Sequence, residues 1–197
     1  VVLSPEYVRH VGEIARENNL FLHMDGARIF NAAAALGVDV KDLVAPADSV
    51  MFCLSKGLAA PVGSMLVGSA KFIKRARHLR KMLGGGMRQA GVLAAAGLIS
   101  LEKMTARLGE DHLRAKILFE GMKQIRGVKL DGVPASNMVY FDLLEETRLS
   151  VQQIADEMKK RGVLVDWAGP RRFRLVTHYW VDDAGVQKAI EAFSEVL

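Results

Sequence analysis

Hydrophobic and polar positions divide the chain into short stretches whose spacing alternates between helix-like and strand-like periods. Residues 5–18 place apolar side chains three and four positions apart, which predicts an amphipathic helix that begins at Ser4 and Pro5. Two short apolar runs follow, at residues 20–24 and 50–54, and each ends in charged or polar residues. Runs that are short and apolar on both faces are typical of strands buried in a parallel sheet.

The stretch between these two runs predicts a helix over residues 28–36, which makes residues 20–54 one strand–helix–strand unit. A third apolar run, residues 64–68, follows after only about ten residues. A parallel connection needs a dozen or more residues, so we expect this third strand to run antiparallel to its neighbour. Residues 70–83 then predict a basic helix, which a run of three glycines at 84–86 ends.

The second half of the chain changes character. Residues 90–101 are apolar on every side, which predicts a helix buried between domains or between subunits. Residues 111–125 predict an amphipathic helix whose inward side chains are Leu113, Ile117, Leu118 and Met122. The remaining predicted elements are strands at 137–143, 163–167 and 173–177, with helices that begin at Ser150 and at Asp182 or Asp183. We therefore expect an α/β fold in two parts, a portion of a large domain over residues 1–105 and a small α/β domain over 106–197.

Two charged residues follow the first two predicted strands, at the strand ends where open α/β sheets build their ligand sites. Asp25 follows the first strand, and Lys56 follows the second, 31 positions later. A right-handed parallel crossover would place both residues at the same edge of the sheet. An amine beside a carboxylate suits pyridoxal phosphate (PLP), because a lysine binds its aldehyde carbon and an acid pairs with its ring nitrogen.

Four motifs occur in order along the chain: HMDGAR, CLSKGLAAPVGS, KMLGGGMRQAG and FRLVTH. Together they resemble the low-specificity threonine aldolases, which are PLP enzymes of fold type I, from about Val2 to the C-terminus. The resemblance implies an aspartate-aminotransferase-like fold, here the C-terminal part of the large PLP-binding domain followed by the small domain. It also implies cleavage of L-threonine or L-allo-threonine to glycine and an aldehyde, in a homodimer or homotetramer with shared active sites.

The resemblance also implies roles for individual residues. Lys56 is expected to be the catalytic lysine that attaches PLP, and Ser55 lies beside it in the cofactor-binding motif. Asp25 is expected to pair with the pyridine nitrogen, and Arg28 is expected to lie beside the phenolic oxygen of the cofactor. Arg174 is expected to hold the carboxylate of the amino-acid substrate, as the arginine fork suits a carboxylate better than a lysine does.

A basic stretch, residues 71–88, carries seven lysines and arginines and no acid. Such a charge can mark a nucleic-acid surface, but the stretch has only Phe72 as an aromatic and no DNA-binding motif accompanies it. We therefore expect no nucleic acid partner, and two interpretations remain: a solvated helix face, or an edge that binds phosphate. The resemblance implies the second, with Lys81 and Arg88 contacting the cofactor phosphate of a neighbouring subunit.

The composition of the chain indicates its class, its compartment and the partners that can be expected. Half of the 197 residues are apolar and a quarter are charged, as in ordinary globular proteins. No apolar run approaches the ~20 residues that span a bilayer, so no membrane partner is expected. The single cysteine, Cys53, cannot form an intramolecular disulfide, which favours the cytoplasm, and no spacing of histidine, cysteine and carboxylates predicts a metal site.

Alternatives remain open at this point. An aromatic amino-acid β-eliminating lyase or a hydroxymethyltransferase-like enzyme would use the same cofactor, and a non-catalytic oligomerising fragment would keep the fold without the chemistry. The chain opens on Val1 rather than on methionine, and no phosphate-binding glycine loop precedes Asp25. We therefore expect it to be the C-terminal portion of a longer enzyme, in which the base that takes the β-hydroxyl proton lies upstream.

Overall fold

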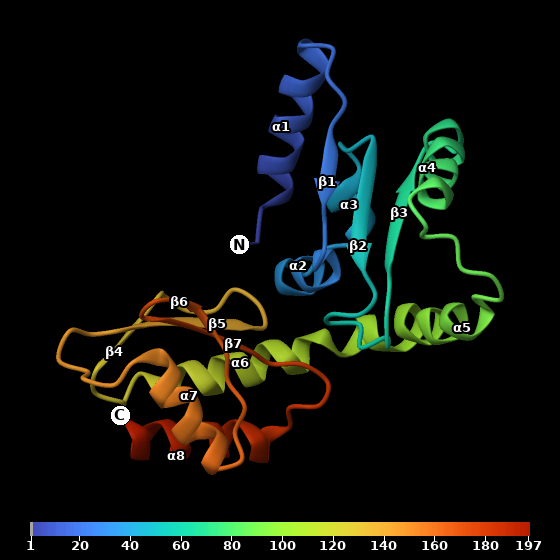
Figure 1. Cartoon of the computed structure of the whole chain (residues 1–197). Helices are drawn as coiled ribbons and strands as arrows, with labels where there is room; N and C mark the ends of the chain where they lie inside the picture. Colours follow the sequence, from blue (N-terminus) through green and yellow to red (C-terminus); the bar gives the residue numbers. More distant parts are fainter. Residues whose placement is uncertain (1) are drawn as a thin grey trace. The chain divides into compact units, whose positions relative to one another are not determined.

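A computed structural model describes residues 2–197. The chain divides into two compact units, Val1–Leu108 and Gly109–Leu197, called here the N-terminal and C-terminal units. Each unit has a sheet of its own (Figure 1), with the strand order β1-β2-β3 in the first and β4-β5-β7-β6 in the second. Within residues 2–197, every helix is too short or too polar to span a lipid bilayer.

The sheet of the N-terminal unit contains β1 (His23–Asp25), β2 (Ser49–Cys53) and β3 (Ser64–Gly68). Strands β1 and β2 run parallel, with Asp25 in register with Met51. Strands β2 and β3 run antiparallel. Both orientations confirm the predictions made from the lengths of the two connections. Strand β3 lies at the edge of this sheet, and all five of its residues are exposed.

Strand β1 is shorter than the sequence predicts. Leu20 and Phe21, predicted to be buried in the strand, are 64% and 92% exposed. The ladder begins at His23, and just before it the backbone amide of Leu22 donates to the Asp48 carboxylate at 2.8 Å.

The helices of the N-terminal unit are α1 (Pro5–Glu17), α2 (Ile29–Leu36), α3 (Val40–Val44), α4 (Ala70–Met82) and α5 (Gly91–Ile99). The Ser4 side chain caps α1 by accepting from the Tyr7 amide at 3.2 Å. The buried face of α1 consists of Val8, Gly12 and Ala15, whereas the apolar Ile14 is 46% exposed. The helix packs closely at Gly12, where a Cβ atom would lie 2.7 Å from Cβ of Pro46.

The C-terminal unit folds around β4 (Val128–Leu130), β5 (Met138–Leu143), β6 (Trp167–Gly169) and β7 (Arg172–Val176). Each neighbouring pair is antiparallel. Helices α6 (Leu108–Met122), α7 (Val151–Lys160) and α8 (Asp183–Val196) pack on one face of this sheet (Figure 1). Phe141, Phe173 and Phe193 form the centre of this core, with ring centroids 5.2 to 6.0 Å apart. A π-helical turn (Ser100–Met104) and a 3-10 turn (Thr105–Arg107) join α5 to α6.

The helix caps predicted for α7 and α8 are confirmed, whereas part of the inward face predicted for α6 is wrong. Ser150 and Gln153 form a capping box on α7, and Asp182 caps α8. Of the four side chains predicted to face inward on α6, Leu118 and Met122 are buried, whereas Leu113 and Ile117 are 60% and 44% exposed, because the fully buried Ala115 carries the close contact with the core.

The strand predicted at residues 163–167, which is β6 in the structure, is also displaced. It begins at Trp167 rather than at residue 163, because only Trp167 and Gly169 pair with β7. Strand β4, for which the sequence shows no strand pattern that was recognised, adds a fourth strand at the other edge.

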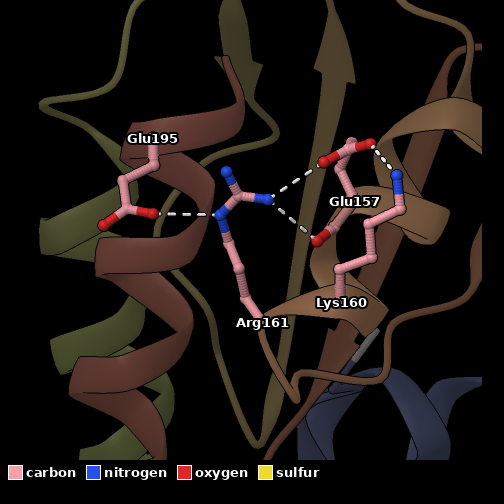
Figure 2. A network of polar contacts seen from close by, with 4 residues as sticks. All are labelled: Glu157, Lys160, Arg161 and Glu195. Carbon is pink, nitrogen blue, oxygen red and sulfur yellow. Dashed lines mark hydrogen bonds and ion pairs between the residues drawn. The ribbon is translucent and has the colours of Figure 1, made fainter.

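An ion network links the ends of α7 and α8 (Figure 2). Arg161, which caps α7, donates from Nε to Glu195 of α8 at 2.9 Å and from Nη1 to the Glu157 carboxylate at 3.1 Å. Lys160 Nζ donates to the other carboxylate oxygen of Glu157 at 2.6 Å. These hydrogen bonds, the largest of them from Lys160, hold the pKa of the Glu157 carboxyl below its usual value.

Candidate active site

Lys56 lies on a loop that leaves the carboxyl end of β2. The backbone amides of Leu54 and Ser55 both donate to the Gly63 carbonyl, at 2.9 and 3.2 Å, and thereby close the loop at its base. Leu58, which is 2% exposed, anchors the loop in the core, while Ser55 and Lys56 face solvent. The exposed Lys56 amine is therefore carried by a loop with buried support, which is how a fold positions a functional side chain.

The turn after Lys56 contains an unusual backbone conformation. Ala59 has φ of 55°, in the left-handed region that non-glycine residues rarely adopt. Its amide donates to the Lys56 carbonyl at 2.9 Å, so this conformation fixes the backbone on the C-terminal side of the lysine. Strain of this kind clusters at functional sites.

Asp25 ends β1 at the same edge of the sheet from which the Lys56 loop departs. One of its carboxylate oxygens accepts from the Ala27 amide at 3.1 Å. Gly26 extends the parallel pairing by donating to the Met51 carbonyl at 2.8 Å, and Cys53 at the end of β2 donates to the Ala27 carbonyl at 3.2 Å. The two strand ends are thus bonded together, which brings Asp25 and the start of the lysine loop to one edge.

Arg28 is three positions after Asp25 and is the residue before α2. Together with Asp25 it lines a cavity of about 160 Å³ beside β1. Ser55 and Lys56 are not among the residues that line this cavity, so Asp25, Arg28, Ser55 and Lys56 share one edge of the N-terminal sheet but not one cavity. Their chemistry combines an amine, a carboxylate, a guanidinium and a hydroxyl.

Lys81 and Arg88 lie apart from that group in the chain, at the end of α4 and beyond the three glycines. The Lys81 side chain runs over Gly86, where a Cβ atom would lie 2.5 Å from its Cδ. Helix α4 buries none of its residues within the unit. In the described part of the chain, neither Lys81 nor Arg88 forms an ion pair, and no hydrogen bond joins them to Asp25 or Lys56.

Arg174 belongs to the C-terminal unit, where it projects from β7 opposite Tyr140. It contrasts with Arg172 on the same strand, which donates to Asp131 and to Asp142 and stacks over the Tyr140 ring at 5.2 Å. The hydrogen bond to Asp131 raises the pKa of the Arg172 guanidinium. Arg174 is exposed and has no such partner among residues 2–197, so its guanidinium fork is available to a ligand.

Sequence reasoning missed Asn31. This amide side chain is 3% exposed in α2, and its atoms lie against Gly57, the residue after Lys56. A lone polar residue in the segment IFNAAAAL was the available signal, because a buried polar group in such a helix needs a specific reason.

Comparisons with known proteins bear on the family and the fold of this chain. A family model described as beta-eliminating lyase matches residues 1–145. Low-specificity L-threonine aldolase 1 of Arabidopsis thaliana is 43% identical over 196 residues, which cover 99% of this chain and 55% of that protein. Low specificity L-threonine aldolase of Escherichia coli K12 is 47% identical over 178 residues, covering 90% of this chain and 51% of that protein. The chain thus spans about half the length of these relatives.

Solved structures show the same fold. A threonine aldolase of Leishmania major superposes with a TM-score of 0.77 at 20% identity, covering 99% of this chain and 57% of that chain. Histidinol-phosphate aminotransferase of Clostridium acetobutylicum superposes with a TM-score of 0.72 at 15% identity, covering 98% of this chain and 59% of that chain. The expected fold type I is therefore confirmed, and the resemblance seen in the four sequence motifs is confirmed by the curated relatives. This chain belongs to the beta-eliminating lyase family.

Proposed function

We propose that this chain is part of a PLP-dependent lyase that cleaves L-threonine, L-allo-threonine and related β-hydroxy-α-amino acids to glycine and an aldehyde. The observation that carries the proposal is that Asp25 and the start of the loop that carries Lys56 lie at the same carboxyl edge of the parallel strands β1 and β2. The relatives named as low-specificity L-threonine aldolases support the choice of reaction. The domain assignment follows: residues 1–105 contribute to the cofactor-binding domain and 106–197 form the small domain.

The residues at this edge fit PLP by their chemistry. The cofactor has an aldehyde, a basic ring nitrogen and a phenolic oxygen, which suit an amine, a carboxylate and a guanidinium in turn. Lys56 supplies an exposed amine, and Asp25 has one oxygen on the Ala27 amide and a second for a ring nitrogen. Arg28 lines the same cavity as Asp25 and suits the phenolic oxygen. The Ser55 hydroxyl precedes the lysine in the sequence.

Each of these residues then has a definite task. When bound, PLP withdraws electrons from Cα of the amino acid that it holds. The Lys56 amine holds the cofactor in the resting enzyme and exchanges with the amine of the substrate. The Asp25 carboxylate keeps the proton on the ring nitrogen, because an adjacent negative charge favours the protonated cation. Arg174 binds the substrate carboxylate with two parallel hydrogen bonds, which orients the bonds at Cα.

We further propose that the active enzyme is a homodimer or a homotetramer of dimers in which Lys81 and Arg88 bind a partner's cofactor phosphate. Two observations support this. Both cations lack acidic partners in residues 2–197, and α5 exposes apolar side chains, with Val92 at 73% and Leu98 at 59%. Two-fold assemblies are the commonest among homo-oligomers. The single cysteine supports the cytoplasmic setting expected from the sequence.

The experiment is covalent trapping of the cofactor in the full natural protein that contains this chain. Borohydride reduction in the presence of PLP, followed by peptide mapping, is expected to label the peptide with Lys56. A Lys56→Ala variant should remain unlabelled, while Lys41→Ala, which removes another exposed lysine of the same unit, should label normally. A label on a different lysine would refute the assignment. Acetaldehyde and glycine as products support the aldolase, whereas pyruvate and ammonia from the same protein would favour a β-eliminating reaction.

A further inference from the structure

The small sheet carries a group of polar side chains on the face that its helices leave free. Phe141 of β5 and Phe173 of β7 point into the core, on the face where α6, α7 and α8 pack (Figure 1). Because successive side chains of a strand point to opposite faces, Tyr140, Arg172 and Arg174 lie together on the second face, called here the polar face. A ligand of this sheet would meet these three side chains.

Tyr140 and Arg174 are directly opposite each other on the polar face. On the same ladder the Thr177 amide donates to the Asn137 carbonyl at 3.1 Å, which makes Asn137 and Thr177 a hydrogen-bonded pair. Hydrogen-bonded and non-hydrogen-bonded pairs alternate along an antiparallel ladder, so Tyr140 and Arg174, three positions further, form a non-hydrogen-bonded pair. In pairs of this kind the Cα atoms are only about 4.5 Å apart and the side chains are closest. The phenol and the guanidinium therefore start from neighbouring points of the sheet.

The Tyr140 hydroxyl has no strong acceptor among residues 2–197. Its one hydrogen bond there goes to the Met138 sulfur at 3.7 Å. A thioether is a weak acceptor, and a partly buried tyrosine hydroxyl normally finds a better one. The hydroxyl proton of Tyr140 is therefore available to a stronger acceptor that comes to the polar face.

Of the two arginines on the polar face, Arg174 is the one that is free to hold an anion. Arg172 donates to both Asp131 and Asp142, so its charge is already neutralised. Within residues 2–197, the Arg174 guanidinium has no carboxylate partner, and the side chain is exposed. A carboxylate that binds to this face is thus drawn to Arg174, beside Tyr140.

Asp166 determines on which side of Arg174 an anion can lie. Trp167 is opposite Phe173, so the preceding residue, Asp166, comes opposite Arg174 on the β6 side. Its Oδ1 accepts from the Trp167 amide at 2.8 Å, and it forms no ion pair with Arg174. A negative charge on the β6 side repels a second carboxylate there, which leaves the β5 side, where Tyr140 lies.

We propose that the Tyr140 hydroxyl donates a hydrogen bond to the substrate carboxylate that Arg174 binds. This rests on the proposed role of Arg174, and it makes Tyr140 a further substrate-binding residue. A carboxylate has more acceptor sites than the guanidinium fork uses, so it accepts from both side chains at once. The amino acid is then recognised from two adjacent strands, and an amine without a carboxylate gains nothing from Tyr140.

Tyr140→Phe in the full natural protein removes the hydroxyl and keeps the ring. We expect KM for L-threonine to rise about tenfold, because a hydrogen bond to a charged group is lost. The substrate and the transition state lose this bond alike, so kcat and Tm should stay near their wild-type values. Tyr7→Phe, which removes an exposed hydroxyl from α1, is the matched control. If Arg174→Leu raises KM and Tyr140→Phe does not, the role of Tyr140 is overturned, whereas an unchanged KM in Arg174→Leu refutes the proposed role of Arg174.

Binding of two small amines tests which group Tyr140 recognises. Glycine and ethanolamine both carry an amine, but only glycine has a carboxylate. In calorimetric titrations of the PLP-loaded protein, Tyr140→Phe is expected to weaken glycine binding about tenfold and to leave ethanolamine binding unchanged. Equal weakening of both would overturn the proposal.

A double variant tests whether Tyr140 and Arg174 act on the same carboxylate. In an Arg174→Leu background the effect of Tyr140→Phe on glycine binding should shrink, because the carboxylate is no longer held beside the phenol. An undiminished effect there would also overturn the proposal. If the protein loads PLP but cleaves no β-hydroxy-α-amino acid, the proposed reaction fails, while the glycine titrations still decide the role of Tyr140.

Discussion

The Asn31 side chain occupies the space that a side chain at position 57 would need, and residue 57 is glycine. A Cβ atom on Gly57 would lie 2.5 Å from Asn31 Oδ1 and 3.3 Å from its Cγ. Since Asn31 is buried in α2 and Gly57 follows Lys56, this contact fixes the lysine loop against the helix. The backbone of the loop approaches the helix as closely as it does only because residue 57 is glycine.

Gly57→Ala is therefore expected to displace the lysine loop. Overpacking of a buried contact costs about 1–3 kcal/mol, and here the displaced atoms carry Lys56. We expect a lower free energy of unfolding in urea and less PLP trapped by borohydride. Gly109→Ala is the matched control, because a Cβ atom there meets nothing within 4 Å. Full trapping in Gly57→Ala would show that the contact does not position the lysine.

Asp25→Asn should separate cofactor attachment from catalysis. The amide oxygen of asparagine still accepts from the Ala27 amide, so the turn after β1 survives. The negative charge that favours a protonated ring nitrogen is lost, and we expect turnover to fall by about 100-fold or more. Borohydride reduction should still trap PLP on Lys56. Turnover within a few-fold of the wild type would contradict the role of Asp25.

Arg174→Leu and Arg172→Leu should have opposite phenotypes, although the residues are two positions apart on β7. Loss of Arg174 removes the fork for the substrate carboxylate, and KM is expected to rise by about 30-fold or more with PLP absorbance unchanged. Loss of Arg172 leaves Asp131 and Asp142 without their shared cation, so Tm should fall while KM stays near the wild-type value. Steady-state kinetics and thermal unfolding on the same two variants distinguish these outcomes.

Arg88→Ala should be rescued by a subunit that is inactive for another reason. If Arg88 reaches a partner's cofactor, a mixed dimer with Lys56→Ala contains one site with both functional residues. Mixing the two inactive variants after mild dissociation should therefore restore part of the activity. Light scattering on the same samples gives the assembly state, and a monomer that is fully loaded with PLP would rule out the shared site.

The ion network of Figure 2 predicts an acid-sensitive C-terminal unit. Hydrogen bonds from Lys160 and Arg161 lower the folded-state pKa of Glu157 below its unfolded value. The stabilisation is therefore present at neutral pH and is lost as the pH falls below 4.5 and through the folded-state pKa. Urea unfolding of Arg161→Gln should show reduced stability at pH 7 and a smaller loss on acidification than the wild type shows. Lys159→Gln, an exposed neighbour without a charged partner in residues 2–197, is the control.

Local signals in the sequence predicted the local parts of the fold. The caps at Ser4, Ser150 and Asp182 act within three residues of themselves, so they are visible in the sequence. The parallel pair β1–β2 and the antiparallel β3 followed from connection lengths. The strand at 163–167 was misplaced because an alternating pattern shows which side faces the core, whereas strand pairing depends on a neighbour far away in the sequence.

The candidate site was predictable to a similar depth. Asp25 and Lys56 follow apolar runs directly, so their place at strand ends can be read from the sequence. The sequence does not show that Arg172 is paired with carboxylates while Arg174 is not, because the partners of Arg172 come from β5 and from the turn that precedes β5. Asn31 was missed for the same reason, since Gly57, which it contacts, lies outside its helix.

Strand β3 has a consequence for the behaviour of this chain in solution. Its apolar side chains Met65, Leu66 and Val67 are 42%, 37% and 41% exposed, and none of its residues is charged. An uncharged edge strand offers its free backbone groups to any similar strand that it meets. A preparation of this chain alone is therefore expected to aggregate as its concentration rises, and a lysine in place of Val67 is expected to keep it dispersed.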